Sequence, residues 1–113
     1  MPGNEKIERI LKTVGIPVAY RQFIPFRDKH VPEPPYLIYI ISPEEAFGAD
    51  RKMLAVRRHV IIELYTGKKD TDLERWVETL LKGWEWSKEE DYIESEALYL
   101  VRYEFDIYEK IGR

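Results

Sequence analysis

The sequence predicts an α+β fold: a two-layer sandwich in which two helices pack on one face of a mostly antiparallel β-sheet. Three observations lead to this prediction. Two segments have the apolar spacing of amphipathic helices, several others have the apolar pattern of strands, and their order is α-β-β-β-α-β-β. A chain of 113 residues corresponds to a single domain, residues 1–113, that buries roughly 65% of its unfolded surface.

The first helix is expected at about Glu5–Val14. Asn4 is a suitable N-cap, and Gly15 and Pro17 end the helical pattern. The apolar stripe consists of Ile7, Ile10, Leu11 and Val14. This spacing predicts a short amphipathic helix with one face turned toward the core.

Three extended segments follow. Ile16–Phe23 has a proline near its start, so we expect an edge strand or a strand that begins after the proline. Tyr36–Ile41 is a continuous apolar run, which indicates a central strand covered on both faces. Ala55–Thr66 alternates in polarity and predicts a long strand with one buried face. A loop at 24–35 with four prolines and a second at 42–54, with room for one helical turn, connect these strands.

The second helix is expected to begin at Thr71. Thr71 and Glu74 have the spacing of a capping box, and Gly83 is suited to end the helix. The stripe expected to face the core consists of Leu73, Trp76, Val77, Leu80 and Leu81. The helix therefore packs on the sheet through its apolar face.

The last third of the chain predicts a hairpin. A short strand is expected at Trp84–Lys88 and a long strand at Tyr92–Tyr108. The acidic residues 89–91 between them are poor strand formers and are expected to form the loop.

The composition excludes several classes of protein. The chain has no cysteine, so it has no disulfide framework, zinc-thiolate site or thiol nucleophile. The N-terminus lacks the apolar core of a signal peptide, and no segment approaches the ~20 apolar residues of a membrane span, so a cytosolic protein without membrane partners is expected.

Charge is unevenly distributed along the chain. Residues 1–60 contain 10 Lys and Arg against 7 Asp and Glu, whereas residues 61–113 contain 8 against 14. The overall net charge of −3 argues against strong sequence-independent phosphate binding. Opposite charge on the two parts of a chain favours correct orientation when copies of the protein meet.

No constellation of catalytic or metal-binding residues emerges. His30 and His59 belong to no metal-ligand spacing, and the acidic residues 89–96 lack the spaced ligands and glycine of a calcium loop. Dinucleotide, phosphate-loop and serine-nucleophile motifs are absent. We therefore expect a protein that is not an enzyme and needs no cofactor or metal. A hydrolase that acts through its carboxylates is a distant alternative.

A small nucleic-acid-binding module remains a second alternative. The basic residues Arg51, Lys52, Arg57, Arg58, Lys68 and Lys69 form the main positive concentration, and they have tyrosine neighbours. Basic side chains next to aromatic rings can bind single-stranded nucleic acid through charge and base stacking. The negative net charge makes direct nucleic-acid binding the less favoured expectation.

Several segments together resemble a family of short proteins from long-tailed bacteriophages and prophages: tail-terminator, tail-completion or minor capsid proteins. The resemblance lies in Gly15–Tyr20 (GIPVAY), Pro35–Tyr39 (PYLIY), Phe47–Asp50 (FGAD), Ile62–Asp70 (IELYTGKKD) and Tyr92–Phe105 (YIESEALYLVRYEF), in that order.

The resemblance implies a structural virion protein that caps the tail tube, commonly as a hexameric ring, and helps to join tail to head. The implied partners are other copies of the chain, the tail tube protein and head-tail connector proteins. The implied location is the host cytoplasm during assembly and then the head-proximal end of the tail. A head-completion or connector protein of the same particle is the nearest alternative.

The family transfers no catalytic residue to this chain, so the contact residues are a physical hypothesis. We expect the two loops to contact neighbouring subunits or the tube. The residues expected to do so are Phe26, Arg27, His30 and Val31 in the first loop and Phe47, Asp50, Arg51 and Lys52 in the second.

Overall fold

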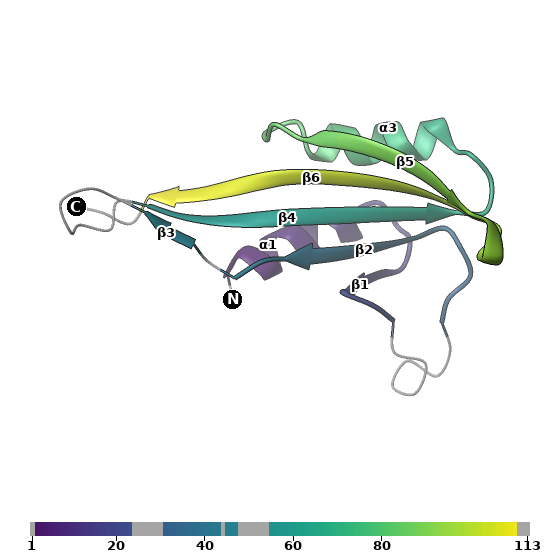
Figure 1. The fold of residues 1–113 in the computed structure, drawn as a ribbon, viewed down its shortest axis with the longest axis horizontal. Helices are drawn as coiled ribbons and strands as arrows, with labels where there is room; N and C mark the ends of the chain where they lie inside the picture. Colours follow the sequence, from purple (N-terminus) through teal and green to yellow (C-terminus); the bar gives the residue numbers. More distant parts are fainter. Residues whose placement is uncertain (1, 24–30, 44, 48–54, 111–113) are drawn as a thin grey trace.

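The computed structural model describes residues 2–23, 31–43, 45–47 and 55–110, and of residues 2–4, 45, 47 and 110 it describes the backbone alone. The predicted α+β fold is confirmed. A single, mostly antiparallel sheet carries two helices on one face (Figure 1).

The sheet contains β1 (Val18–Tyr20), β2 (Tyr36–Ile41), β3 (Glu45–Phe47), β4 (Ala55–Thr66), β5 (Ser87–Ile93) and β6 (Leu98–Lys110). Their order is β1-β2-β4-β6-β5, and β3 also pairs with β4. β1 is parallel to β2, and every other pairing is antiparallel. β4 and β6 are the longest strands and extend past both helices in Figure 1.

The core lies between the sheet and the helices α1 (Pro2–Lys12) and α3 (Thr71–Leu80). The strand registers align Leu37 with Leu64 and Val101, and Tyr39 with Ile62 and Tyr103. The core side chains are Ile7, Leu11, Leu37, Tyr39, Ile41, Val60, Ile62, Leu64, Val77, Leu81, Val101, Tyr103 and Phe105. Alternate residues of β2, β4 and β6 therefore face the helices, as period-two alternation requires.

Helix α1 begins before its expected start and ends two residues before Val14. Asn4 lies within the helix, so the expected cap at this residue is wrong. Pro2 lies at the first helical position, where its missing N–H removes no helical hydrogen bond. At the other end, the N–H groups of Thr13 and Val14 bond to carbonyls three residues back, which tightens the last turn.

Helix α3 is capped by Asp70 rather than by Thr71. The Asp70 carboxylate accepts a hydrogen bond from the Leu73 N–H at 3.0 Å. Glu74 is therefore one position too late for a capping box, and its side chain is buried instead.

Trp76, expected in the core, is 55% exposed. The neighbour of α3 on this side is the edge strand β5, whose Lys88 ammonium lies 3.0 Å from Glu74 and 2.8 Å from Glu78. Lys69 contacts the other Glu74 oxygen at 2.6 Å. Lys88 and Lys69 therefore favour glutamates on the face of α3 that meets β5. Trp76 lies outside that face.

The acidic residues 89–91 lie within β5, so their prediction as a hairpin loop is wrong. The side chains of this edge strand are exposed, and an edge strand tolerates charge. The connection to β6 comes later, through the single 3₁₀ turn Glu94–Glu96 and Ala97, whose φ of 53° is left-handed. The predicted strand Tyr92–Tyr108 is consequently divided between β5 and β6.

Three other boundaries differ from the prediction. Of the predicted strand Trp84–Lys88 only the last two residues are extended, because the Trp84 N–H bonds to the Leu81 carbonyl at 3.0 Å and continues the helix end. β1 is three residues long, lies at the edge of the sheet and starts after Pro17, so both predicted possibilities are confirmed. β3 adds an unpredicted strand to the second loop. β2 and β4 have the predicted bounds.

None of the described helices is long and apolar enough to cross a membrane.

Candidate interaction surface

The sheet has a second face on which none of the described helices packs. We call it the open face. It contains the strand residues that alternate with the core positions, including Ile38, Ile40, His59, Ile61, Glu63, Tyr65, Leu100, Arg102, Glu104 and Asp106. Apolar side chains dominate it on β2, and charged side chains dominate it on β6.

The apolar part of the open face runs from β2 onto β4. Ile40 lies opposite Ile61, and Ile38 lies opposite Glu63. The Tyr36 ring stacks on Tyr65 with centroids 5.1 Å apart. Ile40 and Ile61 are half-buried, so the isolated chain leaves part of this area in contact with solvent.

The charged part forms a ladder across β4, β6 and β5. Arg102 lies between two glutamates: its Nε is 3.4 Å from Glu63 Oε2, and its guanidinium is 3.5 Å from Glu89 Oε1. The Tyr65 hydroxyl donates to Glu63 at 2.9 Å. The positive charge of Arg102 therefore offsets part of the negative charge of Glu63 and Glu89 along one row of the sheet.

His59 lies between two carboxylates on the same face. Its Nδ1 is 2.8 Å from Asp106 Oδ1, and its Nε2 is 2.8 Å from Glu104 Oε1. The hydrogen bonds to Asp106 and Glu104 raise the pKa of His59 above its ordinary value. The cluster is partly solvated, since the histidine side chain is 42% exposed and each carboxylate is 31% exposed.

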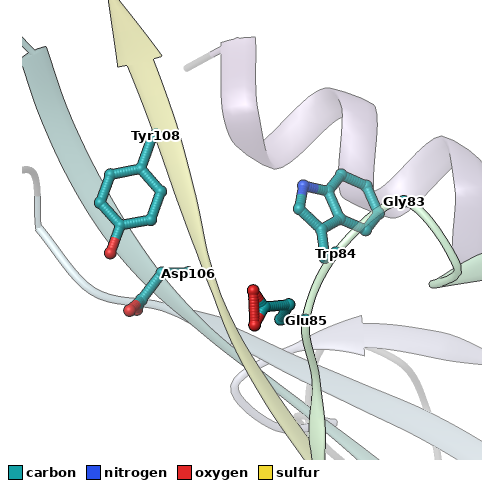
Figure 2. Close-up of a pocket in the computed structure, with 5 residues that line it drawn as sticks. All are labelled: Gly83, Trp84, Glu85, Asp106 and Tyr108. Carbon is teal, nitrogen blue, oxygen red and sulfur yellow. The ribbon is translucent and has the colours of Figure 1, made fainter.

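A groove opens beside this cluster, at the edge of β6. Figure 2 shows its lining residues, which are Gly83, Trp84, Glu85, Asp106 and Tyr108. Its volume is about 460 Å³. One wall is the chain that leaves α3, and the other is the second half of β6.

Trp84 is held firmly on the helix side of the groove. Its ring stacks on Phe105, with centroids 4.9 Å apart and an interplanar angle of 21°. The Lys6 ammonium lies 5.8 Å from the ring centroid. Figure 2 shows the indole nitrogen on the side of the ring that faces β6.

The expected contact residues lie mostly outside the described part of the chain. This holds for Phe26, Arg27, His30, Asp50, Arg51 and Lys52. Val31 is described and is 44% exposed. Phe47 lies in β3, where the backbone alone is described. The two-loop hypothesis thus stays a prediction.

Two of the basic residues that suggested nucleic-acid binding, Arg58 and Lys69, are engaged in ion pairs within the protein. Arg58 is 4% exposed and forms an ion pair with Glu109. Lys69 contacts Glu74 and Glu90. Arg51 and Lys52 lie outside the described residues. The described basic side chains therefore give little support to the nucleic-acid alternative.

The acidic residues of β5 are also engaged. Glu89 contacts Arg102, and Glu90 contacts Lys69. Among the residues that the structure describes, no group of three or more His, Asp or Glu side chains is arranged to hold a metal ion. The described residues therefore offer features suited to contacts with another molecule: charged side chains, aromatic rings and strand edges.

Sequence reasoning missed the groove and the His59 cluster. The cluster depends on the register of β4 against β6, which pairs His59 with Asp106. Two residues 47 positions apart give no local signal of this contact. Tryptophan is enriched in protein interfaces, so the closely spaced Trp84 and Trp86 were the signal that the sequence offered here.

No family model matches the chain, and no curated protein matches it.

Proposed function

We propose that this protein is a non-enzymatic structural subunit of a phage tail, which associates with other copies through the open face of its sheet. The observation that carries the proposal is that face itself: no described helix covers it, yet Ile40 and Ile61 lie side by side on it. An antiparallel sheet with one solvated face normally carries polar residues there.

The arrangement of the open face favours a protein partner. Ile40 and Ile61 can lose solvent contact against a second surface, which supplies the hydrophobic part of association. The adjacent row of Glu63, Arg102 and Glu89 carries both signs of charge. Such a row sets the orientation of a partner more than it adds affinity.

The phage setting rests on the sequence resemblance. The resemblance supports a ring, commonly hexameric, that caps the tail tube and presents a surface to the head connector. In this proposal the chain assembles in the host cytoplasm and ends at the head-proximal end of the tail. A head-completion role in the same particle uses the same kind of surface.

Light scattering coupled to size exclusion, followed by negative-stain imaging, tests the proposal. We expect a discrete oligomer at micromolar concentration and ring-shaped particles in the images. Cyclic contacts between identical subunits close into rings when the rotation allows it. Particles without closed symmetry, or a chain that stays monomeric when mixed with tail tubes, would contradict the proposal.

A further inference from the structure

The proposed function makes no use of the edge of β6 beyond β5, where no described strand pairs with it. β5 begins at Ser87, opposite Glu104. None of the described strands lies along this edge of β6 past that point. The strand itself continues to Lys110, so its second half forms a sheet edge beside the groove (Figure 2).

The hydrogen bonds of β4 fix which backbone groups point to this edge. His59 donates its N–H to Ser42 Oγ, and its carbonyl accepts from the Ser42 N–H, so its backbone points to the β2 side. Asp106 is the register partner of His59 on β6. Because this is a non-hydrogen-bonded pair, the N–H and C=O of Asp106 point away from β4 and into the edge.

The groove leaves room for an added strand. Trp84 stacks on Phe105 on the helix side of the sheet. This contact keeps the chain before Ser87 out of the position that a longer β5 would occupy beside β6. The resulting space of about 460 Å³ falls within the range of about 300–1,000 Å³ typical of binding pockets. The Trp84 indole N–H, directed toward β6, donates no hydrogen bond within the described part of the chain.

We propose that this edge binds an extended segment of a partner protein by β-strand addition, and that the segment alternates apolar and basic side chains. The proposal deepens the assembly function and rests on it. Backbone hydrogen bonds to Asp106 supply the pairing, and the side chains supply the selectivity.

The preference for alternating side chains follows from the two faces of the sheet. A residue added opposite Asp106 directs its side chain to the open face, where the groove is lined by the carboxylates of Asp106 and Glu85. Glu85 is exposed and forms no ion pair among the described residues. The neighbouring residues of the added strand point to the helix side, toward Ile107 and the Trp84 ring.

The test is a titration of the full-length protein with the peptide acetyl-Thr-Val-Lys-Val-Lys-Val-Thr-amide, followed by amide NMR. We expect saturable shifts of the Asp106 amide and of the Trp84 indole N–H. The Ile107 amide, which points to β4, should shift much less. Glu85→Gln should weaken binding at least threefold, because it removes one carboxylate and leaves the groove intact.

Two control peptides separate the backbone from the charge. Glutamate in place of both lysines should bind at least tenfold more weakly, and N-methylation of the central Lys–Val amides should abolish the shifts. Equal binding of the glutamate peptide, or shifts confined to other parts of the protein, would overturn the proposal. The proposal would also fail if the Asp106 amide became protected as the protein concentration rises in the absence of peptide. A second copy of the chain would then fill the edge. If the chain assembles but ignores the peptide, the strand-addition proposal fails while the assembly proposal stands.

Discussion

Trp84 stacks on Phe105 at the point where the chain leaves α3 and approaches the sheet, with ring centroids 4.9 Å apart. The next aromatic residue, Trp86, meets Tyr103 edge-on at 5.5 Å. Strand β5 begins directly afterwards at Ser87. The two tryptophans thus attach this connection to the helix side of β6 and open the groove at its edge.

Replacing Trp84 tests this role of the stack. Trp84→Ala should lower the free energy of unfolding by about 2 kcal/mol, because the half-buried ring loses its packing on Phe105. Trp84→Phe, which keeps an aromatic ring, should recover about half of that loss. Urea denaturation measures both. Equal loss in the two variants would show that stacking is not what holds the connection.

A charge introduced into the apolar part of the open face should prevent assembly. Ile61→Lys is the suitable change, because the lysine remains opposite Glu104 when the chain is monomeric. We expect the oligomer's dissociation constant to rise at least tenfold in sedimentation experiments, while the free energy of unfolding of the monomer changes by less than about 1 kcal/mol.

Trp76→Lys provides the matched control for Ile61→Lys. Trp76 is likewise a large apolar residue in contact with solvent, but it lies on α3 and away from the open face. Its replacement should leave the dissociation constant unchanged. If both variants dissociate equally, loss of apolar surface in general, and not the open face, is responsible.

His59 should make stability depend on pH. The bonds to Asp106 and Glu104 raise its pKa in the folded state, so its contribution is complete below the ordinary value of about 6.5 and is lost as the pH rises through the folded-state pKa. The difference in unfolding free energy between the native protein and His59→Gln should be greatest near pH 5.5.

This pH effect should be small, at most about 1 kcal/mol, because the histidine side chain is 42% exposed and water screens the pairing. Thermal unfolding of both proteins between pH 5.5 and 9 measures it. A difference that grows toward alkaline pH has the opposite sign and would refute the assignment.

Lys88 compensates the buried carboxylate of Glu74. Lys88→Met should reduce the free energy of unfolding by about 1–3 kcal/mol, because it removes ion pairs to Glu74 and Glu78, and Lys69 alone then faces a side chain that is 3% exposed. Lys82→Met is the control at an exposed position and should have little effect. Equal stability of the two variants would argue against this role.

The two predicted contact loops need their own test. Alanine at Phe26, Arg27, Arg51 and Lys52 together should impair assembly, as measured by light scattering, with nearly unchanged thermal stability. A matched loss of folding would contradict a role restricted to contacts.

The sequence was most informative where a single periodic pattern extends over many residues. The alternation of Ala55–Thr66 specified β4 to the residue, and the continuous apolar run Tyr36–Ile41 specified β2. Both patterns arise from burial of whole strand faces, and burial is the largest contribution to folding.

Prediction failed where tertiary partners override local preference. Glu74 is buried and Trp76 exposed because α3 lies beside Lys88 of the edge strand β5 and Lys69 also reaches Glu74, which the spacing within the helix cannot reveal. The acidic run 89–91 is extended for a related reason: Arg102 and Lys69 pair with Glu89 and Glu90. The groove likewise depends on where β5 begins against β6, which is a matter of register.

Sedimentation equilibrium of the native protein beside Ile61→Lys, at matched concentrations, measures most directly whether the open face mediates assembly. We expect a discrete oligomer for the native chain and a folded monomer for the variant. A native chain that remains monomeric up to millimolar concentration, or an oligomer that Ile61→Lys leaves intact, would contradict an assembly role for the open face.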